Sequence, residues 1–140
     1  MEIVELFDKN EIYETLKGLK ESFYDSFDDL EAYANKISVN AKVFACVDKS
    51  PVGIIAFYAN DLSSLTAYIT LITVNKNSQG KGIGRSLLAK TKSYCVDKNF
   101  RRIKLEVNKR NKNAIDFYLK NDFYILSECS ERSLYMQTDL

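Results

Sequence analysis

Three of the chain's five glycines, Gly80, Gly82 and Gly84, alternate with other residues between an apolar segment over 65–74 and a helical pattern over 83–95. A glycine loop that joins a strand to a helix lets several backbone N–H groups point at one place, where the helix dipole adds positive charge. Such a place binds phosphate, and glycine lets a pyrophosphate approach the backbone closely. Neither GxGxxG nor GxxxxGK[ST] is present, so the spacing excludes a dinucleotide fingerprint and a P-loop. The polar side chains around the loop are Lys76, Gln79, Lys81 and Arg85.

The chain contains no histidine, which excludes Ser-His-Asp and Cys-His triads, a histidine base and almost every catalytic zinc site. Cys46, Cys95 and Cys129 are far apart, and none belongs to a CxxC pair. We therefore expect no metal site, and we expect the cysteines to be reduced core residues of a cytoplasmic protein. The N-terminus lacks a signal-peptide pattern and the longest apolar run covers only 54–59, so we expect neither export nor membrane insertion.

Charge is distributed unevenly although the formal net charge is only +1. The first 75 residues carry 6 basic and 12 acidic side chains (net −6), residues 76–120 carry 13 and 3 (net +10), and residues 121–140 carry 1 and 4 (net −3). A segment this basic predicts an anionic partner, either a nucleic acid or a phosphorylated cofactor. Because the glycine loop already supplies a phosphate ligand for this charge, we favour the cofactor and expect no nucleic-acid partner.

The remaining pattern predicts a mixed α/β domain in which helices cover a sheet. At 140 residues, a single domain over 1–140 is expected. Asp8 or Asn10 is the expected cap of the first helix, and Ser26 with Asp29 resembles a capping box at the start of the second. Residue types and periodicity predict strands over 2–7, 42–47, 52–58, 65–74, 101–107, 123–128 and 133–137, and helices over 12–23, 27–37, 83–95 and 111–120.

Two stretches of the sequence resemble the GNAT superfamily of acyl-CoA-dependent N-acetyltransferases. Residues 79–84 are similar to the Q/R-x-x-G-x-G/A pyrophosphate loop of that family, with Val74 at the end of the preceding strand. Residues 108–123 are similar to the segment N-x-x-A-x-x-F-Y-x-x-x-G-F, with Asp122 in place of the last glycine. Asn121 and Asp122 both tolerate a left-handed conformation, so we expect the helix end to be retained. The resemblance implies a mostly antiparallel, twisted sheet of about seven strands, splayed to form a cofactor gap and flanked by about four helices.

The resemblance also implies acetyl-CoA as the acyl donor. Its pantetheine arm would lie between the strands that end at Val74 and Val107, along the backbone near Ile72 and Val74. The N–H groups of the glycine loop would hold the pyrophosphate, and Asn111 would form a hydrogen bond with the pantetheine arm. The residues expected to contact acetyl-CoA are Ile72, Thr73, Val74, Gln79, Gly80, Lys81, Gly82, Ile83, Gly84, Arg85, Asn111, Ala114 and Tyr118.

Acyl transfer to an amine needs a base for the amine and gains from a proton donor for the departing thiolate. Tyr118 has a suitable hydroxyl and occupies the general-acid position of the family motif. The strand over 65–74 lacks the glutamate that many family members carry. Glu106, twelve residues before the tyrosine as in the family's ribosomal-protein N-terminal acetyltransferases, is the candidate base. Two alternatives stay open: an ion pair between Glu106 and Lys104, and deprotonation through a water relay.

The expected acceptor side, between the first two helices and the last hairpin, is rich in acidic residues. These favour a cationic amine, although such charges are also common on a solvated helix face. The acidic residues are Asp25, Asp28, Asp29, Glu31, Glu128 and Glu131. The predicted function is acetyl transfer from acetyl-CoA to a primary amine of a small molecule or peptide N-terminus, by direct attack in a ternary complex. A non-catalytic acyl-CoA sensor and nucleic-acid binding through 101–112 are the alternatives, and the sequence leaves a homodimer open.

Overall fold

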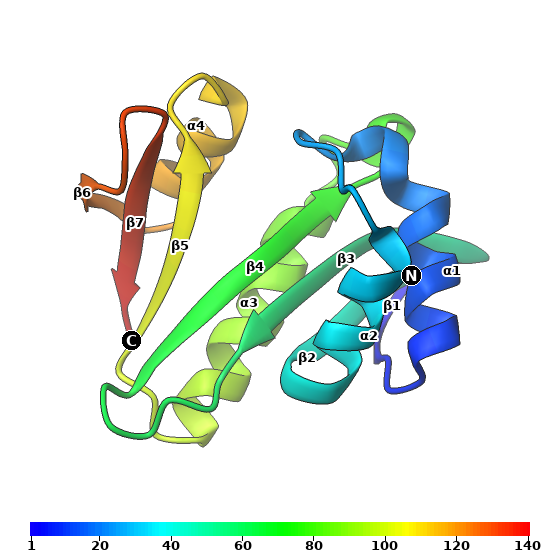
Figure 1. Cartoon of the computed structure of the whole chain (residues 1–140), viewed down its shortest axis with the longest axis horizontal. Helices are drawn as coiled ribbons and strands as arrows, with labels where there is room; N and C mark the ends of the chain where they lie inside the picture. The colour runs from blue at the N-terminus through cyan, green and yellow to red at the C-terminus, as the bar shows by residue number, and fades with distance from the viewer.

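The computed structural model describes all residues, 1–140, as a seven-stranded sheet with helices against both faces (Figure 1). The seven strands, four α-helices and mixed α/β class that the sequence predicts are therefore confirmed. The elements are β1 (Glu2–Glu5), α1 (Lys9–Leu19), η1 (Lys20–Ser22), α2 (Leu30–Asn40), β2 (Lys42–Asp48), β3 (Ser50–Tyr58), β4 (Thr66–Val74), η2 (Lys76–Ser78), α3 (Ile83–Asp97), β5 (Arg102–Asn108), α4 (Lys112–Lys120), β6 (Tyr124–Glu128) and β7 (Ser133–Asp139). None of the α-helices combines the length and the apolar character that a membrane crossing needs.

The start of α2 differs from the prediction of a capping box at Ser26. Asp29 is the N-cap itself, and its Oδ1 accepts a hydrogen bond from the Ala32 N–H at 3.0 Å. Phe27 precedes the helix, which begins at Leu30. Its ring packs on Tyr33 of α2 with a centroid distance of 4.4 Å and so anchors the loop before the helix. At α1 the prediction is confirmed, since Asp8 caps the N–H groups of Asn10 and Glu11.

The sheet is antiparallel except where β4 and β5 lie side by side, in the order β1-β2-β3-β4-β5-β7-β6. These two parallel strands pair only from Thr66 to Ile69 and from Arg102 to Leu105. Beyond those residues they diverge, as Figure 1 shows, and their carboxyl ends have no strand between them. The splayed gap of the predicted fold is therefore present.

A bulge in β4 lies at the point where β4 leaves β5. Ala56 of β3 lies opposite Leu71 and Phe57 lies opposite Ile69, so Thr70 has no partner in the ladder. One extra residue reverses the alternation of side chains between the two faces of a strand. Ile69 and Ile72 therefore pack on the same face, against α3 and α4, while Leu71 packs on the opposite face against α1 and α2.

Two apolar clusters hold the helices on the sheet. The larger cluster fills the space between the sheet and α3, and the smaller one joins β1 to β4 with α1 and α2. No residue of β5, β6 or β7 belongs to the smaller cluster, so these strands have one face without a helix. Cys46 and Cys95 belong to the larger cluster as predicted, whereas Cys129 is half-buried in the β6–β7 turn and lies outside both clusters.

Candidate active site

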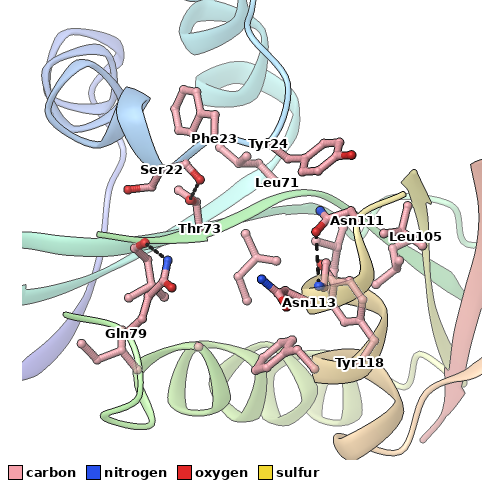
Figure 2. A pocket seen from close by; sticks show the side chains of 18 of the residues that line it. Ser22, Phe23, Tyr24, Leu71, Thr73, Gln79, Leu105, Asn111, Asn113 and Tyr118 are labelled. Carbon is pink, nitrogen blue, oxygen red and sulfur yellow. Dashed lines mark hydrogen bonds between the residues drawn. The ribbon is translucent and has the colours of Figure 1, made fainter. Parts of the chain in front are cut away.

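A cavity of about 1020 Å³ occupies the gap between the diverging ends of β4 and β5. Its wall consists of the two strand ends, the glycine loop, the first turn of α3, one side of α4, and the loop between η1 and α2. Figure 2 shows Ser22, Phe23 and Tyr24 on one side of β4, and Gln79 and Tyr118 on the other. The cavity therefore reaches both faces of the sheet, and its volume is that of a small-molecule site.

The glycine loop leaves the start of α3 open to an anion. Gly80 and Gly82 have φ angles of 81° and 80°, which only glycine adopts without strain. Gly82 is the N-cap of α3, and no side chain caps the helix and no acidic residue lies in its first turn. The first N–H that bonds within this region is that of Ser86, to the Gly82 carbonyl at 3.0 Å. The preceding N–H groups remain free, as phosphate binding at a helix N-terminus requires.

Gly84 permits a close contact between α3 and α4. A Cβ atom at this position would lie 3.2 Å from two carbon atoms of the Phe117 ring. The Phe117 ring in turn lies against Tyr118, with a centroid distance of 5.4 Å. The third glycine of the motif therefore positions the helix that carries Tyr118, and does not supply left-handed backbone.

The side chains of Gln79 and Asn111 each form one hydrogen bond that stabilises the local backbone. The Gln79 side-chain amide donates to the Val74 carbonyl at 3.1 Å and so ties the loop to the end of β4. The Asn111 Oδ1 caps α4 by accepting from the Ala114 N–H at 3.3 Å, as Figure 2 shows. The side-chain nitrogen of Asn111, Nδ2, donates no hydrogen bond within the protein, which leaves this donor available inside the cavity.

Tyr118 is buried in the larger apolar cluster and also lines the cavity. Its hydroxyl has no hydrogen-bond partner in the protein, and burial raises its pKa above the ordinary value. The phenol is therefore protonated at neutral pH and can donate a hydrogen bond. Full transfer of its proton to a thiolate with an ordinary pKa near 8.5 is uphill by at least about 2 kcal/mol. Tyr118 is suited to stabilising negative charge on a leaving sulfur as a donor.

Glu106 lies in the same cavity but on the opposite face of β5 from Leu105 and Val107, which pack with Tyr118. Its Oε2 accepts a hydrogen bond from the buried Ser133 hydroxyl at 2.7 Å. Lys104 does not pair with it, because no ion pair joins the two side chains and the Lys104 ammonium lies 4.0 Å from the Tyr135 ring centroid. The alternative of a Glu106–Lys104 ion pair is wrong in this structure.

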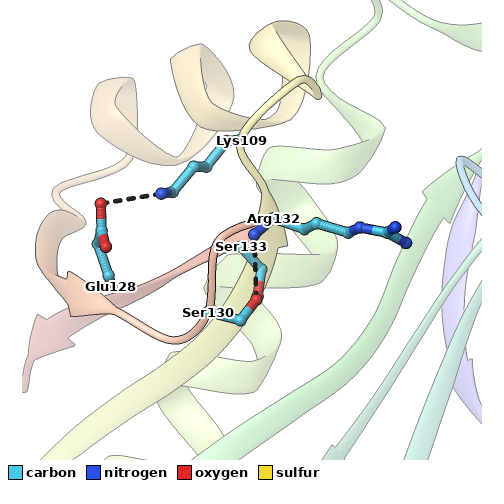
Figure 3. A network of polar contacts seen from close by, with 5 residues as sticks. All are labelled: Lys109, Glu128, Ser130, Arg132 and Ser133. Carbon is cyan, nitrogen blue, oxygen red and sulfur yellow. Dashed lines mark hydrogen bonds and ion pairs between the residues drawn. The ribbon is translucent and has the colours of Figure 1, made fainter.

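Ser133, which holds Glu106, is a residue that the sequence analysis did not single out. Its position depends on the register of β7 against β5, where Ser133 lies opposite Asn108. Ser130 supports it from the turn, with 3.1 Å between the two hydroxyl oxygens (Figure 3). A serine two residues from the partner position of a glutamate has no distinctive signal in a single sequence.

The loop between η1 and α2 forms the other side of the cavity. Phe23, Tyr24, Asp25 and Phe27 line it, and Phe23 packs edge-on against Phe27 at 5.4 Å between ring centroids. The Thr73 hydroxyl donates to the Ser22 carbonyl at 3.1 Å and so fixes the start of this loop to β4. The aromatic residues of this loop are a second feature that the sequence analysis missed, because their spacing resembled that of a helix.

The predicted acidic surface contributes little to the cavity. Of the six acidic residues expected on the acceptor side, only Asp25 lines it. Asp29 caps α2, and Glu128 forms an ion pair with Lys109 at 2.8 Å (Figure 3). Asp25 and Glu106 are therefore the carboxylates of the cavity wall, and neither forms an ion pair.

The sequence-predicted site residues come together around this one cavity, with one exception. Lys81, which lies between the two left-handed glycines, does not line the cavity, and its side chain is exposed. Thr73 lines it, although its hydroxyl is bound to Ser22 on the acceptor side. The residues that line the cavity are Ile72, Thr73, Val74, Gln79, Gly80, Gly82, Ile83, Gly84, Arg85, Glu106, Asn111, Ala114 and Tyr118.

A splayed sheet with an anion-binding loop beside the gap defines a class of acyltransferases, and the comparisons with known proteins agree. The family model of the GNAT acetyltransferases matches residues 4–123. The chain therefore belongs to the GNAT acetyltransferase family, as its two motifs indicated.

Individual proteins are similar to this chain in sequence or in fold. An uncharacterized N-acetyltransferase of Methanocaldococcus jannaschii is 35% identical over 85 residues, which cover 57% of this chain and 38% of that protein. The crystal structure of the PaiA N-acetyltransferase of Thermoplasma acidophilum in complex with coenzyme A has a TM-score of 0.76 and 17% identity, with both chains covered completely. A putative streptothricin acetyltransferase of Bacillus anthracis in complex with acetyl coenzyme A has a TM-score of 0.65 and 26% identity over 72% of this chain and 63% of that one.

Proposed function

We propose that this protein transfers an acetyl group from acetyl-CoA to a primary amine of a small molecule or a peptide N-terminus, by direct attack in a ternary complex. The observation that carries the proposal is the continuity of one cavity. It joins the open N-terminus of α3, through the gap between β4 and β5, to Tyr118 on one face of the sheet and Glu106 on the other.

The residues of the cavity fit the donor. The free N–H groups at the start of α3 match a pyrophosphate, and Arg85 beside them adds positive charge. Past Ile69, the edge of β4 that faces β5 has no strand partner, so its backbone groups are open to the two amides of a pantetheine arm. The Asn111 amide nitrogen is a further donor along this path. Acetyl-CoA supplies the thioester, and the residues below act on the amine and on the leaving sulfur.

Glu106 and Tyr118 divide the proton chemistry between the two sides of the gap. Glu106, held by Ser133, is open to the cavity and accepts the proton of the incoming ammonium. Tyr118 keeps its proton and donates a hydrogen bond to the sulfur as negative charge develops there. A base on one face and a donor on the other suit an amine that attacks through the gap.

Direct attack is favoured over an acyl-enzyme because no cysteine lines the cavity. Cys95 is fully buried, and burial raises the pKa of its thiol to about 12, which keeps it an inert thiol. Burial also raises the pKa of Cys46. A cysteine nucleophile needs the opposite shift.

The non-catalytic sensor is the second candidate, since β4 carries no carboxylate. Glu106 weakens this alternative because it places a carboxylate in the same cavity from the neighbouring strand. A cytoplasmic location, the single domain over 1–140, and the absence of a metal and of a nucleic-acid partner stay predictions.

Calorimetric titration with acetyl-CoA tests the site, with Gly82→Asp as the variant. An aspartate Cβ would meet no atom within 4 Å, but the carboxylate would place negative charge at the N-cap where the pyrophosphate is expected. Gly82→Ala is the matched control, because it strains the left-handed backbone at φ 80° in the same way but adds no charge. We expect one equivalent bound by the parent and by Gly82→Ala, and loss of binding in Gly82→Asp. Thiol release from acetyl-CoA in the presence of amines then separates the enzyme from the sensor.

A further inference from the structure

A second cavity, of about 580 Å³, lies between the loop that joins β3 to β4 and the first residues of β4 and β5. Its wall includes Tyr68 and Lys104, which directly precede Ile69 and Leu105 in the wall of the active-site cavity. The two cavities therefore follow one another along the same pair of strands. The remaining lining residues are Tyr58, Asn60, Asp61, Ser64, Thr66, Arg102 and Gln137.

The wall of this second cavity has an excess of hydrogen-bond donors. The Tyr58 hydroxyl is buried and has no partner, although buried polar atoms in proteins are nearly always paired. Lys104 forms no ion pair, and its ammonium lies over the Tyr135 ring. Arg102 donates to the Ser64 carbonyl and to the Thr66 hydroxyl, again without a carboxylate partner. Neutral and cationic donors in one hollow match an anion.

The one carboxylate in the wall is already satisfied. Asp61 accepts hydrogen bonds from the hydroxyls of Ser63 at 2.8 Å and Ser64 at 2.7 Å, and these bonds lower its pKa to about 2. Asp61 stays ionised and forms no ion pair, so the three charged side chains of the wall, Asp61, Arg102 and Lys104, sum to a charge of +1.

Tyr68 and Lys104 connect this hollow with Glu106. Tyr68 lies opposite Lys104 in the pairing of β4 with β5, and burial and the negative charge of Glu106 raise the pKa of its hydroxyl to about 12. Lys104 is two residues before Glu106 on β5 and shares its face of the sheet, at a distance of about 7 Å along the strand. Arg102 follows at about 13 Å.

We propose that the second cavity binds an anionic group of the acceptor, so that the acceptor is an amine that also carries a carboxylate or a phosphate. This inference rests on the proposed function, because the amine is placed at Glu106. It differs from the expectation of a cationic acceptor, since only Asp25 of the predicted acidic surface lines the active-site cavity.

The test compares four amines that share a six-carbon chain: 6-aminohexanoate, 6-aminohexyl phosphate, hexylamine and 1,6-diaminohexane. One charged hydrogen bond predicts a kcat/KM about tenfold higher for an anionic amine than for hexylamine, and the first two substrates distinguish carboxylate from phosphate. Lys104→Met, which keeps the apolar stem, should reduce this ratio to near one. Lys98→Met is the matched control, because Lys98 also lies over a tyrosine ring but lines neither cavity, and it should keep the ratio.

Tyr58→Phe gives a second signature. Removal of an unpaired buried hydroxyl should raise the melting temperature, and the same change should lower the preference for the anionic amine. A merely structural tyrosine would not show a gain in stability together with a loss of selectivity.

The proposal is overturned if the parent uses hexylamine as well as the anionic amines, if it prefers the diamine, or if Lys104→Met keeps the tenfold ratio. If no amine is acetylated, the proposed function fails separately, and calorimetric titration with 6-acetamidohexanoate decides on the anion site alone. Binding by the parent that weakens about tenfold in Lys104→Met supports the site, and no binding by the parent overturns it.

Discussion

Replacement of Tyr118 by phenylalanine removes one oxygen from the cavity wall and leaves the ring in place. The Tyr118 hydroxyl has no partner in the protein, so the variant loses no internal hydrogen bond. The ring keeps its contacts with Phe117 and Phe123, at 5.4 Å between centroids in each case. We therefore expect a melting temperature within about 1–2 °C of the parent, as for a change that costs a few tenths of a kcal/mol.

The effect on turnover follows from the same geometry. A hydrogen bond to a charged group contributes about 1.5–3 kcal/mol, and this one is formed only as charge develops on the sulfur. The loss corresponds to a decrease of roughly 10- to 150-fold in kcat, with the affinity for acetyl-CoA unchanged. Because the pKa of Tyr118 is raised, the parent should show no loss of activity from its ionisation up to the ordinary tyrosine pKa of 10.0.

Thiol release measured with a chromogenic disulfide gives kcat, and calorimetry gives the affinity for acetyl-CoA. A Tyr13→Phe variant is the matched control, because Tyr13 lies in α1 and lines neither cavity. An unchanged kcat in Tyr118→Phe would refute the role of the hydroxyl. A decrease that comes only from weaker binding of acetyl-CoA would assign Tyr118 to the cofactor and not to the leaving sulfur.

Four further results are expected. Glu106→Gln should remove the acidic limb of the pH profile of kcat/KM while its amide still accepts from Ser133, and an unchanged profile would favour a water relay. Thr73→Val breaks the bond to Ser22 at a cost of about 1 kcal/mol, and the KM for the amine should rise more than that for acetyl-CoA. Gly84→Ala should displace the Phe117 ring by a few tenths of an ångström and lower kcat, with a destabilisation of about 1 kcal/mol measured by urea unfolding; an unaltered kcat would contradict this account of Gly84. Burial raises the Cys95 pKa from 9.0 to about 12, so the stability that this thiol contributes is complete below pH 9 and is lost between pH 9 and 12. In Cys95→Ala, the free energy of unfolding should therefore fall less steeply with pH over that range than in the parent.

The parts of the site that rest on local backbone conformation could be predicted from the sequence. Left-handed Gly82 and the left-handed residue Asp122 at the end of α4 are found where the motifs indicated them. Contacts that depend on register could not be predicted, because the bond from Ser133 to Glu106 requires the pairing of β5 with β7. The loop before α2 was mistaken for helix, since Phe27 has helical spacing but packs on Tyr33 from outside the helix.

In the proposed reaction, the bulge at Thr70 makes β4 a partition between the two substrates. Past the bulge, Leu71 and Thr73 point to the side of α1 and α2, where the amine is expected, and Ile72 and Val74 point to the side of α3 and α4, where the pyrophosphate loop lies. Neighbouring positions of one strand are therefore expected to contact different molecules, the amine on one side and acetyl-CoA on the other. Natural variation at the first pair can redirect the enzyme to a new amine while the second pair keeps the same donor, so that a single strand lets specificity evolve separately from cofactor use.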